Sequence, residues 1–322
     1  STGERRWSID AAKVGESFAS PLVLEENGLA VVGTLAGEVL FIDGQSGQIR
    51  AKHGLPGKIR GGAASDGTRI FVATDEGFVV AFSVDGEELW RTQHHYRIPG
   101  SGDGGIEDVT TRPASIVSEP TVAKDLVILI YEREEALETP PWFALDRRDG
   151  TLRWEPDVLP NFTAWTGLSA SPSFAGELLA FNLPESTASI GFLMDERRAD
   201  FISNTPTCNT YAWASSVRLP DAIYHVRMDG MFYAQTDIYA SVIWHAFLGK
   251  ADLYPKYPAE NRTAPGECRE APLIGRGIAS TPAVARDGGV LVGTLEGYML
   301  KLEGPPPEED AEASTSGAAA PE

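Results

Sequence analysis

Cysteine is scarce in this sequence, which has 2 cysteines among 322 residues. Cys208 and Cys268 lie far apart and form no Cys-x-x-Cys pair, and this spacing argues against a zinc ribbon and against a thioredoxin-type redox site. In an exported protein the two can form a single disulfide, and the alternative is two buried free thiols. The sequence leaves both open.

Basic residues are also in deficit, because 27 Lys and Arg face 46 Asp and Glu and the formal net charge is −19 at pH 7. An acidic surface repels phosphate backbones, and the sequence contains no basic stripe that would bind nucleic acid. We therefore expect no nucleic-acid partner. Direct docking on anionic lipid is disfavoured for the same reason.

Long apolar runs are missing, and no stretch reaches the about 18 residues that a membrane-spanning helix needs. The sequence also lacks a Gly-x-Ser-x-Gly elbow, a phosphate-binding Gly-Lys-Ser/Thr loop and a His-Glu-x-x-His helix, so the standard catalytic classes gain no support. The chain begins at Ser1 rather than at methionine, which indicates either a removed export signal or a shortened chain.

The residues that are present repeat along the chain. Three segments read as strand, tight turn, strand: Val32 to Asp43, Val72 to Ser83 and Val292 to Glu303. Their turn glycines, Gly37, Gly77 and Gly297, occupy the same place, where glycine adopts a left-handed backbone without strain. The flanking apolar residues alternate or run continuously, a pattern typical of strands and not of helices.

Two further elements recur around this hairpin. Upstream, a strand begins with Ser-Pro or a similar pair, at Pro21, Pro120, Pro172 and Pro282. Downstream, a turn leads into an edge strand at Asp43 to Ile49, Val84 to Trp90 and Leu145 to Trp154. Four short strands in about 40 residues are typical of one propeller blade, so the fold class is all-β.

This combination of a Ser-Pro strand, Gly-Thr, a turn glycine, Leu-Asp and Asp-Gly-x-x-x-Trp resembles the PQQ-like propeller repeat of BamB-type proteins and quinoprotein dehydrogenases. The resemblance implies a single propeller over residues 1–303 with about six blades. Their approximate ranges are 18–53, 58–92, 117–155, 168–203, 211–247 and 278–303. A seventh blade between Ile238 and Ile274 stays open.

The two ends of the chain have separate predicted roles. The sixth blade lacks its Asp-Gly-x-x-x-Trp segment, and Glu4 to Asp10 resembles the missing outer strand. We expect residues 4–10 to complete the last blade and close the ring, which removes unpaired sheet edges. Residues 304–322 form an acidic Pro/Ala-rich tail with too few apolar residues to fold, so we expect this tail to be disordered.

The resemblance also suggests an enzyme, a dehydrogenase that uses PQQ and calcium in the central funnel. Quinoprotein dehydrogenases have a larger ring, a vicinal cysteine pair against the quinone and an aspartate base beside calcium. Cys208 and Cys268 are not adjacent. A fold does not carry its function with it, so we expect no catalysis and no cofactor, with the dehydrogenase or a carbohydrate-binding module as the alternative.

Three stretches exceed hairpin length and are expected to be long loops: Thr92 to Ile116, Thr205 to Ala212 and Gly249 to Gly277. Candidate interaction residues come from these insertions and from tryptophans outside the repeat register. His94 and His95 are candidate metal ligands or an acid/base pair, but solvated side chains on a polar loop are the preferred interpretation. Asp103 to Asp108 departs from a calcium-binding loop pattern. Trp90 and Trp154 are expected to pack between blades. The other candidates for an exposed surface are Tyr96, Arg97, Trp142, Trp165, Trp213 and Trp244, although an isolated tryptophan is more often part of the core. The candidates for the funnel mouth are Arg60 and Arg276, and the alternative for both is a solvated loop arginine.

A stiff ring with loops on two faces suits the binding of partners better than movement during catalysis. The sequence thus predicts a non-catalytic scaffold for protein–protein interaction at the bacterial cell envelope, within an outer-membrane or surface assembly. The expected partners are other envelope proteins. The expected location is periplasmic or extracellular. This expectation includes a lipid-anchored protein from which the anchor has been removed.

Overall fold

The computed structural model describes residues 6–17, 21–98, 110–133, 141–155, 171–175, 178–182, 188–193, 198–204, 217–218, 223–226, 231–235, 242–247, 281–284, 289–294 and 299–302. Within these residues the chain consists almost entirely of antiparallel strands. The helical pieces described are α1 (Ala11–Val14) and a 3-10 turn at Glu25–Asn27. The predicted all-β class is confirmed.

The described strands form six consecutive sheets, which we number as blades 1 to 6. Blade 1 contains β1 (Leu22–Leu24), β2 (Leu29–Gly33), β3 (Glu38–Asp43) and β4 (Ile49–Gly54). Blade 2 contains β5 (Ala64–Ser65), β6 (Arg69–Ala73), β7 (Phe78–Ser83) and β8 (Glu88–Gln93). Blade 3 contains β11 (Ser115–Ile116), β12 (Thr121–Ala123), β13 (Leu126–Glu132), β14 (Trp142–Asp146) and β15 (Leu152–Trp154).

The second half of the chain continues the pattern. Blade 4 contains β16 (Ser173–Ala175), β17 (Leu178–Asn182), β18 (Ala188–Leu193) and β19 (Arg198–Asn204). Blade 5 contains β20 (Val217–Arg218), β21 (Ile223–Val226), β22 (Met231–Gln235) and β23 (Val242–Phe247). Blade 6 contains β24 (Ala283–Val284), β25 (Val290–Gly293) and β26 (Met299–Leu302). Two more strands, β9 (His95–Ile98) and β10 (Thr110–Pro113), pair with each other outside the blades.

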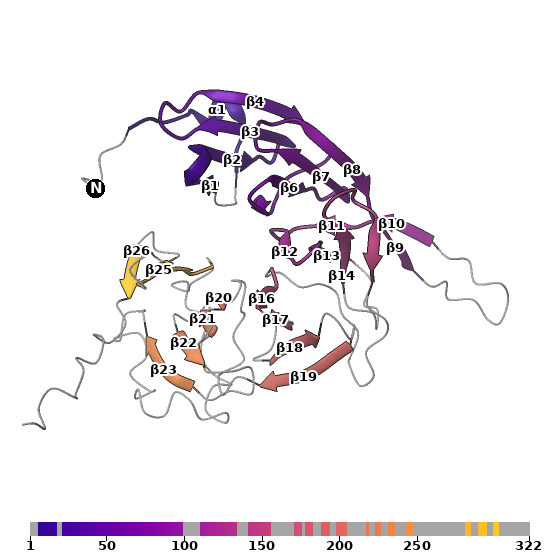
Figure 1. The fold of residues 1–322 in the computed structure, drawn as a ribbon, viewed down its shortest axis with the longest axis vertical. Coiled ribbons are helices and arrows are strands. Elements are labelled where there is room, and N and C mark those ends of the chain that lie inside the picture. The colour runs from indigo at the N-terminus through magenta and orange to yellow at the C-terminus, as the bar shows by residue number, and fades with distance from the viewer. Residues whose placement is uncertain are drawn as a thin grey trace, which may run out of the picture.

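Figure 1 shows that the blades follow one another in sequence order around a common centre. Strands β1, β12, β16 and β20 lie nearer to this centre, and β4, β8, β19 and β23 lie on the outer side. The predicted innermost strands are confirmed in position for β1, β12 and β16, which Pro21, Pro120 and Pro172 directly precede (Figure 1), and Pro282 likewise directly precedes β24. A proline is tolerated there because the start of a strand need not donate to the ladder.

The hydrophobic cores lie between neighbouring blades. Blade 2 has a neighbour on each side, and its strands are apolar on both faces. In β6, Ile70 and Val72 pack against blade 1, while Phe71 and Ala73 pack against blade 3. Alternate residues of a strand point to opposite faces, so a blade with a neighbour on each side needs apolar residues throughout. The predicted turn glycines Gly37 and Gly77 join such strands, and both have a left-handed φ of 79°.

One contact recurs between neighbouring blades. The Trp90 ring of β8 lies against the turn of blade 3, where a Cβ on Gly150 would come within 2.6 Å of the ring. Ala51 holds the same place in β4, since it pairs with Phe41 as Trp90 pairs with Ala81. Ala51 contacts the blade 2 turn at Gly86. The side chain at this position of one blade thus fills the space left by a glycine of the next.

Trp7 makes the same contact with blade 1 from the N-terminal segment. Its ring lies against Gly47, and its Nε1 donates a hydrogen bond of 3.0 Å to the Gly44 carbonyl. Trp90 likewise donates a bond of 3.1 Å to the Arg147 carbonyl. Residues 6–10 are not in a strand, and blade 6 has three strands among the described residues. Ring closure by residues 4–10 therefore stays a prediction, as does the number of blades. The tail at 304–322 lies outside the described residues.

Candidate functional site

The boundary between blades 2 and 3 carries the most distinctive part of the structure. The sequence between the two blades, expected to be a loop over Thr92 to Ile116, instead contains β9, β10 and β11. Strands β9 and β10 form a two-stranded ribbon with Arg97 opposite Thr111 and His95 opposite Pro113. Figure 1 shows this ribbon projecting outward beside blade 3.

His94 fixes the base of the ribbon. Its imidazole is 8% exposed, stacks on the Phe143 ring at 3.8 Å between centroids, and lies 3.1 Å from Oε1 of Glu155. Its backbone N–H donates to the Gly77 carbonyl and its carbonyl accepts from the Ala114 N–H. The hydrogen bond from His94 is the main cause that holds the pKa of the Glu155 carboxyl below its usual value. His94 therefore joins blade 2, blade 3 and the ribbon.

Tyr96 fixes the inner face of β9. Its ring is buried and stacks on Tyr131 of β13 with centroids 5.4 Å apart. Burial raises the pKa of the Tyr131 hydroxyl. The buried Arg133 guanidinium lies 6.0 Å from the centre of the Tyr131 ring, a distance typical of a cation–π contact. The inner face of the ribbon is thus part of the core of blade 3.

The opposite face of the ribbon is open to solvent. Because strand residues alternate between faces, His95 and Arg97 point away from the buried Tyr96. Both are exposed, as are all four residues of β10. The ribbon therefore presents a solvent-exposed face on a buried and well-anchored support.

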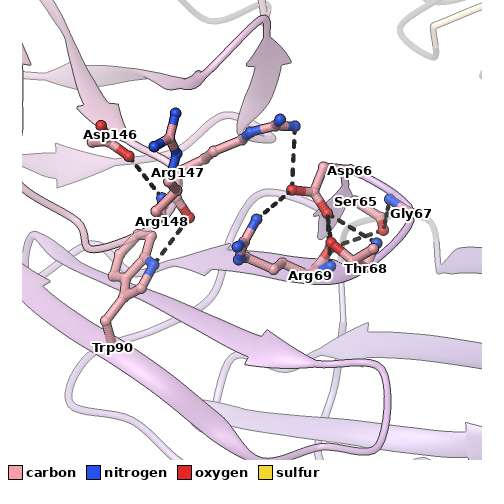
Figure 2. Close-up of polar contacts among 9 residues, drawn as sticks. All are labelled: Ser65, Asp66, Gly67, Thr68, Arg69, Trp90, Asp146, Arg147 and Arg148. Atoms are coloured by element: carbon pink, nitrogen blue, oxygen red, sulfur yellow. Dashed lines mark hydrogen bonds and ion pairs between the residues drawn. The ribbon is translucent and has the colours of Figure 1, made fainter.

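A polar network also holds blades 2 and 3 together, at the end of the blade 2 strands opposite to His94 (Figure 2). The Asp66 carboxylate, 2% exposed, accepts bonds from the backbone N–H of Thr68 and from the Arg69 guanidinium. Arg147 of blade 3 reaches the same carboxylate at 3.4 Å. Burial acts to raise the pKa of Asp66, but hydrogen bonds from Thr68 and Arg69 outweigh burial and keep this pKa below its ordinary value.

The same boundary contains Arg60, the candidate for the funnel mouth. Arg60 is 44% exposed and its Nε lies 3.3 Å from Oδ2 of Asp75. Beside it, a Cβ on Gly61 would come within 2.2 Å of the Ser118 carbonyl oxygen, so only glycine fits there. The neighbouring Glu119 is exposed at the surface. Surrounding protein atoms still partly desolvate its carboxyl, and this desolvation raises the pKa of the carboxyl. A role for Arg60 in partner binding stays a prediction.

Three candidates for exposed positions are buried, and the first is Tyr96, whose ring stacks on Tyr131 in the core of blade 3. His94 is not a solvated loop residue. It lies between β8 and β9, and its imidazole ring stacks on the Phe143 ring. Trp142 is not an exposed binding residue but is 1% exposed and packs edge-to-face on Trp154 at 4.6 Å. Strand β14 lies between β13 and β15, and all five of its residues are buried. The expectation that Trp90 packs between blades is confirmed by its contacts with Gly150 and the Arg147 carbonyl.

Several candidates lie outside the described residues. These are Trp165, Trp213, Arg276, the acidic segment Asp103 to Asp108, and the two cysteines, Cys208 and Cys268. Trp244 belongs to β23, whose strand alone is described. In the part of the chain that the structure describes, no group of three or more His, Cys, Asp or Glu is arranged to hold a metal ion. No helix among the described residues is long and apolar enough to cross a membrane.

Sequence reasoning missed Glu155, Tyr131, Asp66 and Arg147. Glu155 follows Trp154 at the end of the repeat, and no spacing rule links it to His94. Asp66 and Arg147 belong to the turns of different blades and meet only when these blades pack. A search for charged residues beside the repeat's turn positions is the one signal that would have drawn attention to this pair.

Comparison with known proteins identifies the family of this chain. The family model described as outer membrane protein assembly factor BamB matches residues 1–190. This chain belongs to the BamB family. The resemblance to PQQ-like repeats noted in the sequence is therefore confirmed. No curated protein sequence matches the chain.

Solved structures show the same fold. BamB from Moraxella catarrhalis is 16% identical, with a TM-score of 0.52, and the match covers 89% of this chain and 76% of that one. A europium-containing methanol dehydrogenase is 16% identical, with a TM-score of 0.59 over 85% of this chain and 60% of that one. The quinohemoprotein alcohol dehydrogenase from Comamonas testosteroni is 14% identical, with a TM-score of 0.50 over 77% and 45%. These similarities make the fold a β-propeller.

Proposed function

We propose that this member of the BamB family is a non-catalytic propeller scaffold that holds partner proteins at the bacterial cell envelope. The observation that carries the proposal is the match of residues 1–190 to a family described as an outer membrane protein assembly factor. Under this proposal the protein is periplasmic or extracellular and its partners are other envelope proteins.

The contacts between blades support a scaffold role, because a binding platform has to keep its shape. Trp90 and the Asp66 network join blades 2 and 3, while Ala51 and Gly86 join blades 1 and 2. Ser171 of blade 4 donates a bond of 2.7 Å to the Glu119 carbonyl of blade 3. Side chains that are ordered before binding lose less conformational entropy when the partner arrives.

The proposal includes a closed ring. Trp7 lies on the blade 1 turn as Trp90 lies on the blade 3 turn, with an indole N–H donated to the matching carbonyl in both cases. The outer strand of a preceding blade would supply a tryptophan to this place. This equivalence supports residues 4–10 as the outer strand of the last blade, next to blade 1.

The experiment is affinity purification of the tagged chain from the native envelope, combined with a dye-reduction assay. We expect a stable complex with other envelope proteins, and no reduction of dye with alcohols or sugars after PQQ and calcium are added. Dye reduction that depends on both additions would instead support the dehydrogenase function suggested by the fold similarity to methanol dehydrogenase. Purification of the chain alone, without dye reduction, would contradict the scaffold.

A further inference from the structure

On the basis of the proposed scaffold function, we propose that the outer edge of β9, formed by His95 and Arg97, docks an extended acidic segment of a partner protein. In this binding mode the segment adds a strand to the ribbon. Backbone hydrogen bonds supply affinity, and carboxylates opposite the Arg97 guanidinium and the His95 imidazole supply selectivity.

The direction of the backbone groups follows from the pairing. The Ala114 N–H donates to the His94 carbonyl at 3.0 Å, and the ribbon continues in the same register with His95 opposite Pro113. Hydrogen-bonded and non-hydrogen-bonded pairs alternate along an antiparallel ladder. The backbone groups of Tyr96 and Ile98 therefore point toward β10, and those of His95 and Arg97 point away from it.

This outward edge has no partner strand in the described part of the structure. Strand β9 pairs with β10 and with no other described strand. An unpaired edge with free N–H and C=O groups is a template for a strand from another chain. Natural proteins usually cover or disrupt such edges, so an edge that no described strand covers points to a partner.

The ribbon is also held in place before any partner binds. Tyr96 is stacked on Tyr131, Ile98 packs against the core shared by blades 2 and 3, and His94 is fixed by Phe143 and Glu155. An edge that is already ordered binds a peptide with less loss of entropy than a mobile loop. The anchoring therefore favours a docking edge.

The charges on this edge select an acidic partner. Cations on the outer strands of blades 1 and 2 have carboxylate partners in their own blade, as in Lys52 with Glu38 and Arg91 with Glu88. Arg97 lies near enough to Glu155 to lower the pKa of that carboxyl, but it forms no ion pair with any described residue. On a chain with a net charge of −19, an exposed arginine beside an exposed histidine is a local exception.

The test uses the full chain and two fluorescein-labelled peptides, one of alternating glutamate and valine and one of alternating lysine and valine. Fluorescence anisotropy measures their binding. We expect the glutamate peptide to bind and the lysine peptide not to bind. Arg97→Glu is expected to weaken binding of the glutamate peptide by roughly fivefold to tenfold, because an attraction across strands becomes a repulsion.

Two variants of Arg97 separate the contribution of the side-chain charge from that of the backbone N–H. Arg97→Val keeps the outward N–H and removes the charge, so its loss should be no more than about fivefold. Arg97→Pro also removes the N–H, and proline is tolerated where this group faces solvent. We expect Arg97→Pro to abolish binding while circular dichroism stays unchanged. The control is Arg91→Glu, an equal change of charge on β8, which should bind as the unchanged chain does.

The proposal is overturned if the unchanged chain does not bind the glutamate peptide, if Arg97→Pro binds as well as Arg97→Val, or if Arg91→Glu weakens binding as much as Arg97→Glu. Purification of the Arg97→Pro variant from the envelope separates the two proposals. A complex that survives this substitution leaves the scaffold function standing and removes the β9 edge as the docking site.

Discussion

Replacing Gly150 by alanine is the sharpest test of the contact between blades. Gly150 has a left-handed φ of 74°, and a Cβ there would lie 2.6 Å from the Trp90 ring. The left-handed backbone costs a residue with a Cβ about 1–2 kcal/mol, and forcing the ring aside adds about 1–3 kcal/mol. We therefore expect Gly150→Ala to lower the free energy of unfolding by about 2–5 kcal/mol.

Gly67→Ala is the matched control. Gly67 also has a left-handed φ, at 90°, but no atom lies within 4 Å of the position of its added Cβ. Only the backbone cost of about 1–2 kcal/mol applies there. The difference between the two alanine variants therefore isolates the clash with Trp90.

A double-mutant cycle completes this experiment. In a Trp90→Ala background the clash with the ring is gone, so Gly150→Ala should cost less than it does beside Trp90, and the coupling energy should be up to about 1–3 kcal/mol. Ala51 already occupies the matching place in blade 1, which indicates that a blade folds with alanine there. Urea unfolding followed by far-ultraviolet circular dichroism gives the four free energies. Equal costs of Gly150→Ala in the two backgrounds would refute the reasoning.

Three further substitutions, with one control, test other contacts by the same unfolding measurement. Asp66→Asn should destabilise the fold by about 1–3 kcal/mol, because a buried carboxylate loses its charged partners. The control, Asp149→Asn in an exposed turn, should destabilise the fold much less. The hydrogen bond from His94 lowers the pKa of the Glu155 carboxyl below 4.5, its usual value. The stabilisation from this pair is therefore fully present above pH 4.5 and is lost as the pH falls through the lowered pKa. The stability gap between the unchanged chain and Glu155→Gln should therefore narrow below pH 4.5, and a constant gap would contradict the assignment. Trp7→Ala should cost about 2 kcal/mol if the N-terminal segment is docked as described, and an unchanged free energy would remove that contact.

The repeat made much of the fold readable from the sequence. The turn glycines Gly37 and Gly77 predicted hairpins because few other residues adopt their backbone angles, and prolines such as Pro120 predicted strand starts because they cannot donate inside a ladder. These are local properties of the chain. They need no knowledge of what packs nearby, so each copy of the repeat gave the same answer.

Burial at the blade 2 and 3 boundary could not be read in this way. His94 lies in a polar sequence but is covered by Phe143, which comes from a different blade. Trp142 breaks the tryptophan register and still packs on Trp154 inside blade 3. The burial of His94 depends on the strands that follow β8 and on Phe143 of blade 3, and the sequence pattern alone indicated only a loop after β8.

The contacts of Ala51 with Gly86 and of Trp90 with Gly150 run in one direction along the chain, from the outer strand of one blade to a glycine of the next. In the described contacts, blades 1 and 2 each act as donor of a side chain to the next blade, and blades 1, 2 and 3 each act as acceptor, blade 1 from Trp7 of the N-terminal segment. Extra sequence that begins after the donor residue, as the ribbon after Trp90 does, leaves both roles intact. This arrangement explains how such a protein can acquire new surface elements between blades without rebuilding the joints, and it marks the positions just after the donor residue as the places to graft a binding peptide.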